Sequence, residues 1–340
     1  MAVADSNSWR NEFESRGIRF KKIFTLKLRK VEGGRINFLA LLAFPFALIQ
    51  ALWVLFIFMP DAVFSKGGFT SVIPSLVAQF YFIPIFIHES DSIPGMANRF
   101  LAKFAKKIFI SFENSAVYFK AGKTVLSGNP IRENLLNGDK NQAAAYFNLN
   151  PGLKTILFLG GSQGAVFINN LLTNGLVQLV KDFQIIHQTG AKNFDSVNQE
   201  IDRIKKEGSA SYGNDIEKKY RIFGFLKEEE LKNAFAMGDV VVARGGSSIF
   251  EISAVGRPAI VIPYPYSAHN HQKENAREFA KFGAVVLDES NLKPHILIDQ
   301  IKHLLNSANY SSVGQRIRQF ANLESGKIIA REISSYVFRK

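Results

Sequence analysis

Short apolar runs alternate with helical patterns along most of this chain. Each run is rich in Val, Ile and Phe and is bounded by Gly, Pro or polar residues, as strands commonly are. Strands that alternate with helices are typical of parallel sheets covered on both faces, so the chain is predicted to be an α/β protein. The predicted strands are 62–65, 83–88, 107–112, 124–127, 155–159, 184–187, 221–223, 240–243, 259–262 and 284–287.

The strands fall into two series, with a break near the segment 128–132, Gly-Asn-Pro-Ile-Arg. A chain of 340 residues has room for roughly two domains. We predict two doubly wound domains, at 1–131 and 132–321, facing each other across a cleft, with ligands at the carboxyl ends of the strands. The last helices, at 322–340, are expected to pack back on the first domain. The clearest helices are predicted at 140–147, 165–179, 248–255 and 271–282.

The charge balance limits the partners that this chain can have. Lys and Arg number 42 and Asp and Glu number 29, which gives a formal net charge of +13. Such an excess points to a nucleic acid, an acidic membrane surface or a phosphorylated substrate. The absence of cysteine excludes disulfides, a thiolate nucleophile and cysteine-based zinc sites, and permits a reducing, cytosolic location. A mean hydropathy of +0.02 excludes a polytopic membrane protein.

A basic segment and an uncharged apolar segment follow one another near the N-terminus. Residues 16–35 hold eight basic side chains and one acidic side chain, whereas 36–60 hold no charge. The apolar segment could be a transmembrane anchor with its basic flank inside, a helix lying on an acidic membrane, or a buried helix. Pro45, Gln50 and the strand that follows directly weaken the spanning interpretation. We favour a membrane-associated helix.

A second basic surface is predicted on the helix after residue 88. Arg99, Lys103 and Lys106 are spaced four and three residues apart, so they would share one helical face. With Phe100 and Phe104 nearby, this face would suit a membrane. Alternatively, it is an ordinary solvated surface.

Residues 155–165 read as a strand, a glycine-rich turn and the start of a helix. Gly160, Gly161 and Gly164 let a ligand approach the backbone, where free N–H groups and the positive helix end suit a phosphate. Ser162 could add a hydroxyl donor. A plain tight turn usually needs a single glycine, so we favour phosphate binding. The spacing matches neither Gly-x-Gly-x-x-Gly nor a P-loop, so it does not indicate a dinucleotide or ATP site.

Residues 243–251 form a second strand-to-helix turn of the same kind. Its segment 245–248, Gly-Gly-Ser-Ser, offers amide and hydroxyl donors. Glu251, about one turn into the helix, could accept two hydroxyls of a ribose. Alternatively, Ser248 and Glu251 form a helix capping box, and both interpretations can hold together.

Polar segments also follow other predicted strands. The amides and imidazoles of 269–275 suit sugar hydroxyls, although they could equally be a polar helix start. His269 and His271 would need further partners to bind a metal. The segment 88–95 brings three titratable groups to one strand end and could supply a general base, or it is a polar loop. The segment 66–71 is another glycine turn at a strand end.

Taken together, these segments closely resemble the MurG family, peptidoglycan glycosyltransferases of glycosyltransferase family 28. The resemblance runs in order from about Phe13 to the C-terminus. It is carried by DAVFSKGGFTSV, IFIHESDSIPGMANR, GNPIRE, ILFLGGSQGA, HQTG, DVVVARGGSSIFE and the segment around Gln272. It implies a GT-B fold of two Rossmann-like domains. The N-terminal domain would take the lipid acceptor and the membrane, and the C-terminal domain would take UDP-N-acetylglucosamine.

The resemblance also implies roles for individual residues. Arg132 and Ser162 would contact the diphosphate, and Leu226 would lie beside the uracil through its backbone. Glu251 would hold the ribose hydroxyls and Gln272 those of the sugar. The residues lining the nucleotide and sugar would be Gly246, Ser247, Ser248, Ile249 and Phe250.

The implied reaction is a single inverting displacement without metal or cofactor. The 4-hydroxyl of lipid I, undecaprenyl-pyrophosphoryl-MurNAc-pentapeptide, would attack C1 of N-acetylglucosamine as UDP leaves, making lipid II for the cell wall. Amides at 161–164 would stabilise the growing diphosphate charge, and closure of the cleft would exclude water. The implied partners are UDP-N-acetylglucosamine, lipid I and an anionic membrane surface, with no nucleic acid. The implied location is peripheral, on the cytoplasmic face of the cell membrane.

The chain departs from the family pattern in the region of the catalytic base. The family opens with a strand and a loop like Gly-Gly-Thr-Gly-Gly-His, whose His is a favoured base, and nothing in 1–30 matches this loop. We therefore expect the chain to enter the family pattern one βα unit late. His88, Glu89 and Asp91 are the expected stand-ins for the base.

Two smaller departures concern single positions. Many relatives have Asn where this chain has Asp91, and the usual Arg of the second turn is displaced, since Ala243 precedes Arg244. The departures leave two alternatives to a lipid I transferase. One is a truncated, catalytically impaired protein that binds a UDP-sugar or a membrane. The other is a GT-B enzyme with another lipid acceptor.

Overall fold

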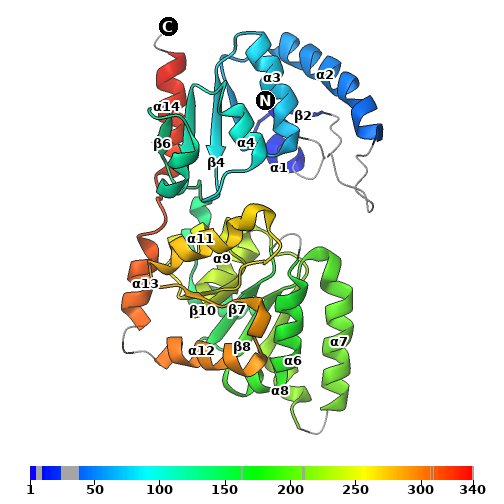
Figure 1. The fold of residues 1–340 in the computed structure, drawn as a ribbon. Coiled ribbons are helices and arrows are strands. Elements are labelled where there is room, and N and C mark those ends of the chain that lie inside the picture. Colours follow the sequence, from blue (N-terminus) through cyan, green and yellow to red (C-terminus); the bar gives the residue numbers. More distant parts are fainter. Residues whose placement is uncertain are drawn as a thin grey trace. The chain divides into compact units, whose positions relative to one another are not determined.

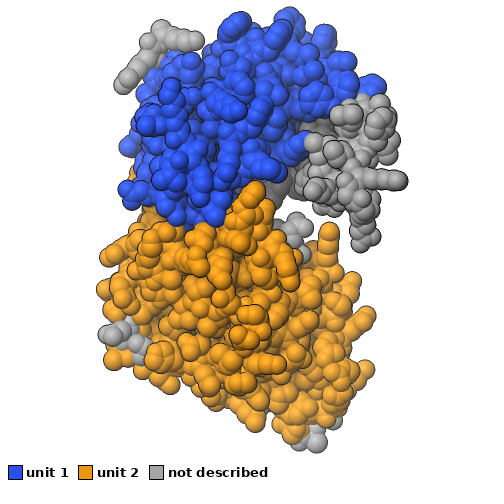
Figure 2. Space-filling model, in the orientation of Figure 1, with its two compact units in different colours: residues 1–128, 327–340 blue, residues 129–326 orange. Residues whose placement is uncertain are grey.

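The computed structural model describes residues 1–4, 10–23, 38–161, 164–208, 211–306, 308 and 310–338, with the backbone alone at 38–43. The chain forms two compact units, coloured separately in Figure 2. Unit 1 consists of Met1–Gly128 with Lys327–Lys340, and unit 2 of Asn129–Gly326. The chain therefore leaves unit 1 after Gly128 and returns to it after Gly326.

Every strand predicted from the apolar runs is present in a parallel sheet, which confirms the α/β class. The strands are β1 Ala2–Ala4, β2 Phe20–Lys22, β3 Val63–Ser65, β4 Ile85–Glu89, β5 Lys107–Ile110, β6 Thr124–Leu126, β7 Thr155–Leu159, β8 Gln184–Gln188, β9 Tyr220–Phe223, β10 Val240–Ala243, β11 Ala259–Val261 and β12 Val285–Val286. The parallel pair of β1 and β2 was not predicted, because Phe-Lys-Lys in β2 is not an apolar run.

The predicted helices are present as well. In chain order the helices are α1 Arg10–Ser15, α2 Phe38–Phe58, α3 Val72–Phe80, α4 Met96–Leu101, α5 Lys140–Phe147, α6 Val166–Asp182, α7 Phe194–Glu207, α8 Gly213–Lys219, α9 Glu228–Met237, α10 Ser248–Val255, α11 His271–Ala280, α12 Pro294–Asn306, α13 Tyr310–Arg318 and α14 Ser325–Val337.

In unit 1, strands β3, β4, β5 and β6 form a sheet in that order. Side chains alternate between its two faces because successive residues of a strand point to opposite sides. Ile85 and Ile87 of β4 belong to the core that α2 and α3 cover. Phe86 and Phe109 lie in the opposite core with Ile329 of α14. Helix α14 thus covers one face of the sheet and α2 and α3 the other (Figure 1).

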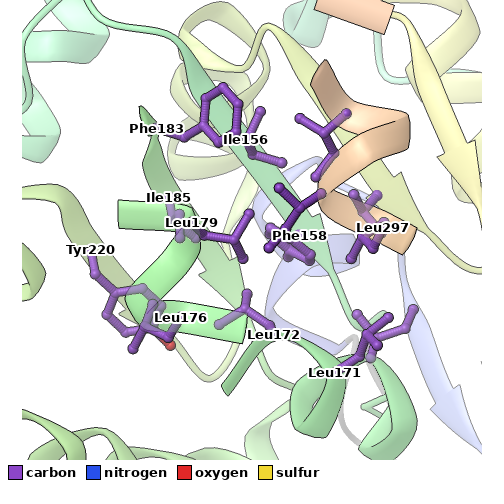
Figure 3. Packing of buried hydrophobic residues seen from close by; sticks show 14 of the residues in the cluster. Ile156, Phe158, Leu171, Leu172, Leu176, Leu179, Phe183, Ile185, Tyr220 and Leu297 are labelled. Atoms are coloured by element: carbon purple, nitrogen blue, oxygen red, sulfur yellow. The ribbon is translucent and has the colours of Figure 1, made fainter. Parts of the chain in front are cut away.

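In unit 2, a parallel sheet has the strand order β12-β11-β10-β7-β8-β9. One of its cores combines Phe158 of β7, Leu172 of α6 and Leu297 of α12, which converge in Figure 3. From β7 the chain adds strands on one side, and after β9 it crosses back to add β10 on the other. Such a reversal creates a crevice at the carboxyl ends of the two central strands, here β7 and β10. The two glycine-rich turns follow these strands.

Helix α2 confirms that the apolar segment is helical, although 36 and 37 lie outside the described residues. One side buries Ala47, Ala51 and Leu55 in the core of unit 1. The prediction of an entirely buried helix is wrong, because the other side exposes large apolar side chains, namely Phe46, Ile49, Trp53, Phe56 and Ile57. Among the residues with described side chains, which begin at Phe44 in α2, no helix is long and apolar enough to cross a membrane.

The prediction of one helical face for Arg99, Lys103 and Lys106 is wrong. Helix α4 ends at Leu101, and both lysines lie beyond it. The backbone N–H of Lys106 donates to the carbonyl of Ile85 at the start of β4, 2.8 Å away. The chain has to turn before Lys106 to make this contact, which leaves no room for further helical turns.

Candidate functional site

The two glycine-rich turns of unit 2 begin side by side. Leu159 and Ala243, the last residues of β7 and β10, are register partners in the sheet. Gly161 has a φ of +71° and Gly164 a φ of +81°, a left-handed conformation that glycine adopts without strain. A Cβ on Gly160 would lie 2.7 Å from the carbonyl of Gln188, so the turn also needs glycine for close packing. Ser162, predicted to contact the diphosphate, lies outside the described residues.

The second turn lies directly against the segment that contains Gln272. A Cβ on Gly245 would come within 2.3 Å of the Gln272 carbonyl, and Asn275 donates to the Gly245 carbonyl at 3.0 Å. The structure thereby brings together two segments that the sequence analysis assigned separately to one sugar nucleotide. The Gln272 side chain accepts a hydrogen bond from the Tyr264 N–H at 3.0 Å.

Glu251 and Arg132, both predicted to contact the donor, contact each other. Arg132 donates to Glu251 Oε1 through Nε at 2.9 Å and approaches it through Nη2 at 2.8 Å. Burial raises the pKa of Glu251, while the Arg132 charge and hydrogen bond oppose that rise. The capping-box alternative is wrong, because α10 begins without a side-chain cap and the Glu251 carboxylate turns to Arg132.

The other residues predicted to line the donor differ in whether they are buried or exposed. Ile249 and Phe250 are buried, and Phe250 stacks on Phe320 with ring centroids 4.9 Å apart. Their side chains therefore build the core, and they can reach a ligand only through the backbone. Ser247 is exposed, and open space surrounds the Cα of Gly246, so this part of the turn is accessible.

Leu226 is buried, and its backbone N–H donates to Gln188 Oε1 at 3.0 Å. Gln188 ends β8 and therefore positions the backbone that the resemblance places beside the uracil. Gln188 was not among the residues predicted to form the site. The motif HQTG, which contains this residue, was the signal that could have found it.

The three stand-ins for the base lie at the end of β4 in unit 1. His88 is fully buried, with Nδ1 2.9 Å from Lys66 Nζ and Nε2 3.0 Å from the Gly128 carbonyl. Burial, and secondly the charge of Lys66, lower the pKa of His88 to about 4. The ring is therefore neutral near pH 7. Lys66 belongs to the glycine turn 66–71, for which no role was predicted.

Glu89 holds the loop that follows β4. Its carboxylate accepts hydrogen bonds from the Asp91 N–H at 2.9 Å, the Gly95 N–H at 3.2 Å and Asn98 Nδ2 at 2.9 Å. Burial raises its pKa, and these hydrogen bonds oppose the rise. Asp91, unlike His88 and Glu89, is only partly buried.

A pocket of about 450 Å³ lies beside the loop before α11. It is lined by Tyr266 and Asn270 of this loop, by Lys273 of α11 and by Phe167 at the start of α6. Asn270 and the preceding His269 both adopt left-handed conformations, with φ of 57° and 53°. Among the described residues, no three His, Asp or Glu side chains gather as a metal site would require.

Family models of known proteins match residues in both units of the chain. The glycosyltransferase family 28 N-terminal domain matches residues 2–110, and the family 28 C-terminal domain matches residues 155–327. A protein of Halothermothrix orenii is 38% identical over 281 residues, which cover 80% of this chain and 72% of that protein. One of Syntrophus aciditrophicus is 36% identical over 308 residues, covering 85% and 78%. Both are named UDP-N-acetylglucosamine–N-acetylmuramyl-(pentapeptide) pyrophosphoryl-undecaprenol N-acetylglucosamine transferase.

Solved structures share the fold. MurG of Acinetobacter baumannii superimposes with a TM-score of 0.70 at 22% identity, over 98% of this chain and 90% of that one. UDP-GlcNAc 2-epimerase of Neisseria meningitidis, bound to UDP-GlcNAc, gives a TM-score of 0.65 at 14% identity, over 98% of each chain. The predicted GT-B fold of two Rossmann-like domains is confirmed. With both family domains matched in order and relatives above 30% identity, the chain belongs to glycosyltransferase family 28.

Proposed function

We propose that this protein is an inverting glycosyltransferase that moves N-acetylglucosamine from UDP-N-acetylglucosamine to lipid I and so makes lipid II for peptidoglycan. The names of its relatives support this donor and acceptor. The observation that carries the proposal is the pair of glycine-rich turns at the ends of β7 and β10, with Glu251 on the helix that follows. Unit 2 is proposed to hold the donor and unit 1 the acceptor.

The donor is proposed to lie across the ends of the unit 2 strands. The glycine-rich turn after β7 and the positive end of α6 suit a diphosphate. Glu251 accepts the ribose hydroxyls, and Gln272 exchanges its contact with Tyr264 for the sugar hydroxyls. Arg132 has two parts in this proposal. Its guanidinium would contact the diphosphate, and it also donates the hydrogen bond that holds the Glu251 carboxylate.

The proposed reaction is one displacement at C1 of the donor sugar. The acceptor 4-hydroxyl oxygen forms a bond to C1, the bond from C1 to the UDP oxygen breaks, and the hydroxyl proton passes to a base. We assign the base to Asp91, since both ring nitrogens of His88 are hydrogen-bonded and Glu89 holds its loop. We propose that charge developing on the leaving diphosphate is stabilised by the positive end of α6, which follows this turn.

The membrane is proposed to meet unit 1 on the exposed apolar side of α2. This side continues toward the end of α3, since the rings of the exposed Phe56 and of Tyr81 lie 6.4 Å apart. Beyond it, the exposed Phe82 lines a hollow of about 390 Å³ together with Lys103 and Lys106. Apolar side chains beside lysines suit the interface of an anionic bilayer. We propose peripheral binding at the cytoplasmic face, where the lipid acceptor is reached.

The test is transfer of radiolabelled N-acetylglucosamine from its UDP donor to a lipid I analogue in detergent. We expect labelled disaccharide lipid from the full chain, and none from the Asp91→Asn variant. Calorimetry with UDP-N-acetylglucosamine runs in parallel. Heat of binding without transfer by the unaltered chain would refute the enzyme and leave a sugar-nucleotide binding protein. Transfer to a diacylglycerol instead of lipid I would refute the acceptor.

A further inference from the structure

Lys66 lies at one end of a hydrogen-bonded chain that joins three strand ends of unit 1 through His88. It follows β3, and its ammonium lies 2.9 Å from Nδ1 of His88 on β4. The other ring nitrogen of His88 lies 3.0 Å from the carbonyl of Gly128, which follows β6. Gly128 is the last residue before the chain leaves unit 1, and its φ of +79° is a glycine conformation.

The partners of the His88 ring fix where its proton sits. A carbonyl oxygen can only accept, so Nε2 carries the proton and donates to Gly128. A lysine ammonium can only donate, so Nδ1 is unprotonated and accepts from Lys66. Ser111 Oγ also lies near Nε2, at 3.3 Å. A buried ring held in this way aims the Lys66 ammonium and does not itself receive a substrate proton.

The charges of two carboxylates act on the Lys66 ammonium. Loss of hydration lowers its pKa to about 8, although part of the side chain remains exposed, while the charges of Glu89 and Asp91 act to raise it. The titratable groups that face it are therefore His88 and Glu89 on β4 and Asp91 on the following loop. Of the two carboxylates, Glu89 already accepts three hydrogen bonds from its own loop.

We propose that Lys66 is a positioning residue for the transfer reaction, and that its ammonium, aimed by His88, keeps the Asp91 carboxylate charged. This inference rests on the proposed function, in which Asp91 takes the acceptor proton. A carboxylate can act as a base only while it is ionised, and a neighbouring cation favours that form. The role requires the positive charge of Lys66 and not a covalent step.

The first experiment is the pH profile of kcat/KM for Lys66→Met and Lys66→Arg. Without the cation, Asp91 protonates at higher pH, so the acid limb of the Met variant moves up by about one pH unit. The Arg variant restores the limb toward its original position, because it keeps the charge. Lys120→Met, an exposed lysine of unit 1, is the matched control and leaves the profile unchanged. An acid limb that stays in place in Lys66→Met overturns the inference.

The second experiment needs no turnover. Carbon-13 NMR of the Asp91 carboxyl, assigned by its loss in Asp91→Asn, follows its titration in the unaltered chain and in Lys66→Met. We expect the titration midpoint of Asp91 to be higher in Lys66→Met and to return toward its original value in Lys66→Arg. Equal midpoints in all three proteins refute the role of Lys66. If the chain transfers no sugar while the midpoint moves as expected, the proposed function fails and the coupling of Lys66 to Asp91 stands.

Discussion

Arg132 and Glu251, separated by 119 positions in the sequence, form an ion pair at 2.8 Å in unit 2. The side chain of Glu251 is 18% exposed, so this carboxylate is largely withdrawn from water. Both residues were predicted to bind parts of one ligand, and the Arg132 charge opposes the rise that burial causes in the pKa of Glu251. The contact leads to two predictions.

Glu251→Ala should weaken binding of UDP-N-acetylglucosamine by about 1–3 kcal/mol, or roughly 5- to 150-fold in Kd. The reason is that the ribose hydroxyls lose their acceptor. Isothermal titration calorimetry measures the change. Glu200→Ala, which removes a carboxylate side chain that is 39% exposed on α7, serves as the control and should bind as before. An unaltered Kd in Glu251→Ala would remove the ribose assignment.

Arg132→Met should destabilise unit 2 more at pH 8 than at pH 5. Burial raises the folded-state pKa of Glu251, so the folded state holds its proton more tightly than the unfolded state, and stability falls as pH rises through that range. Without Arg132 this fall in stability is larger, because the Arg132 charge no longer offsets the burial of the Glu251 carboxylate. Melting curves at the two pH values measure it. An equal decrease in melting temperature at pH 5 and at pH 8 would contradict this account.

Trp53→Ser combined with Phe56→Ser should reduce binding to anionic vesicles with little change in melting temperature. Both side chains are exposed, at 66% and 57%, so the fold loses little packing while the membrane loses apolar contact. Cosedimentation with phosphatidylglycerol vesicles measures binding. Leu153→Ser, an exposed apolar residue of unit 2, is the control. Undiminished cosedimentation of the double variant would exclude this side of α2 as the contact.

His187 should make unit 2 sensitive to acid. It is fully buried between Tyr220 and Asn169, and burial lowers its pKa to about 3. The unfolded state takes up a proton near pH 6.5 and the folded state does not, so stability is lost as pH falls from about 6.5 toward 3, at up to about 1.4 kcal/mol per pH unit. Urea unfolding of His187→Gln should show a flatter dependence on pH between 6.5 and 4. An unchanged slope would exclude His187 as its source.

The sequence predicted those parts of the site that depend on local pattern. The apolar runs located the strands that carry the site, and the glycines at 160–164 and 245–246 marked the turns after β7 and β10. The roles of Gln272 and Glu251 in binding one sugar nucleotide are implied by the family resemblance and stay predictions. The strands, helices and turns were placed correctly because strand and helix periodicity, turn chemistry and glycine conformation act over a few residues.

Contacts between distant residues were decided only by the tertiary structure. Tertiary packing places Lys66 against His88, Gln188 against Leu226 and Arg132 against Glu251, and no local spacing encodes these pairs. The early end of α4 follows from the pairing of Lys106 with Ile85. Likewise α2 is apolar on every side, so its sequence cannot tell which side packs on unit 1. The sequence by itself therefore determined the elements and the turns, while packing determined which charges meet and which apolar face stays exposed, because burial and pairing depend on residues far apart in the chain.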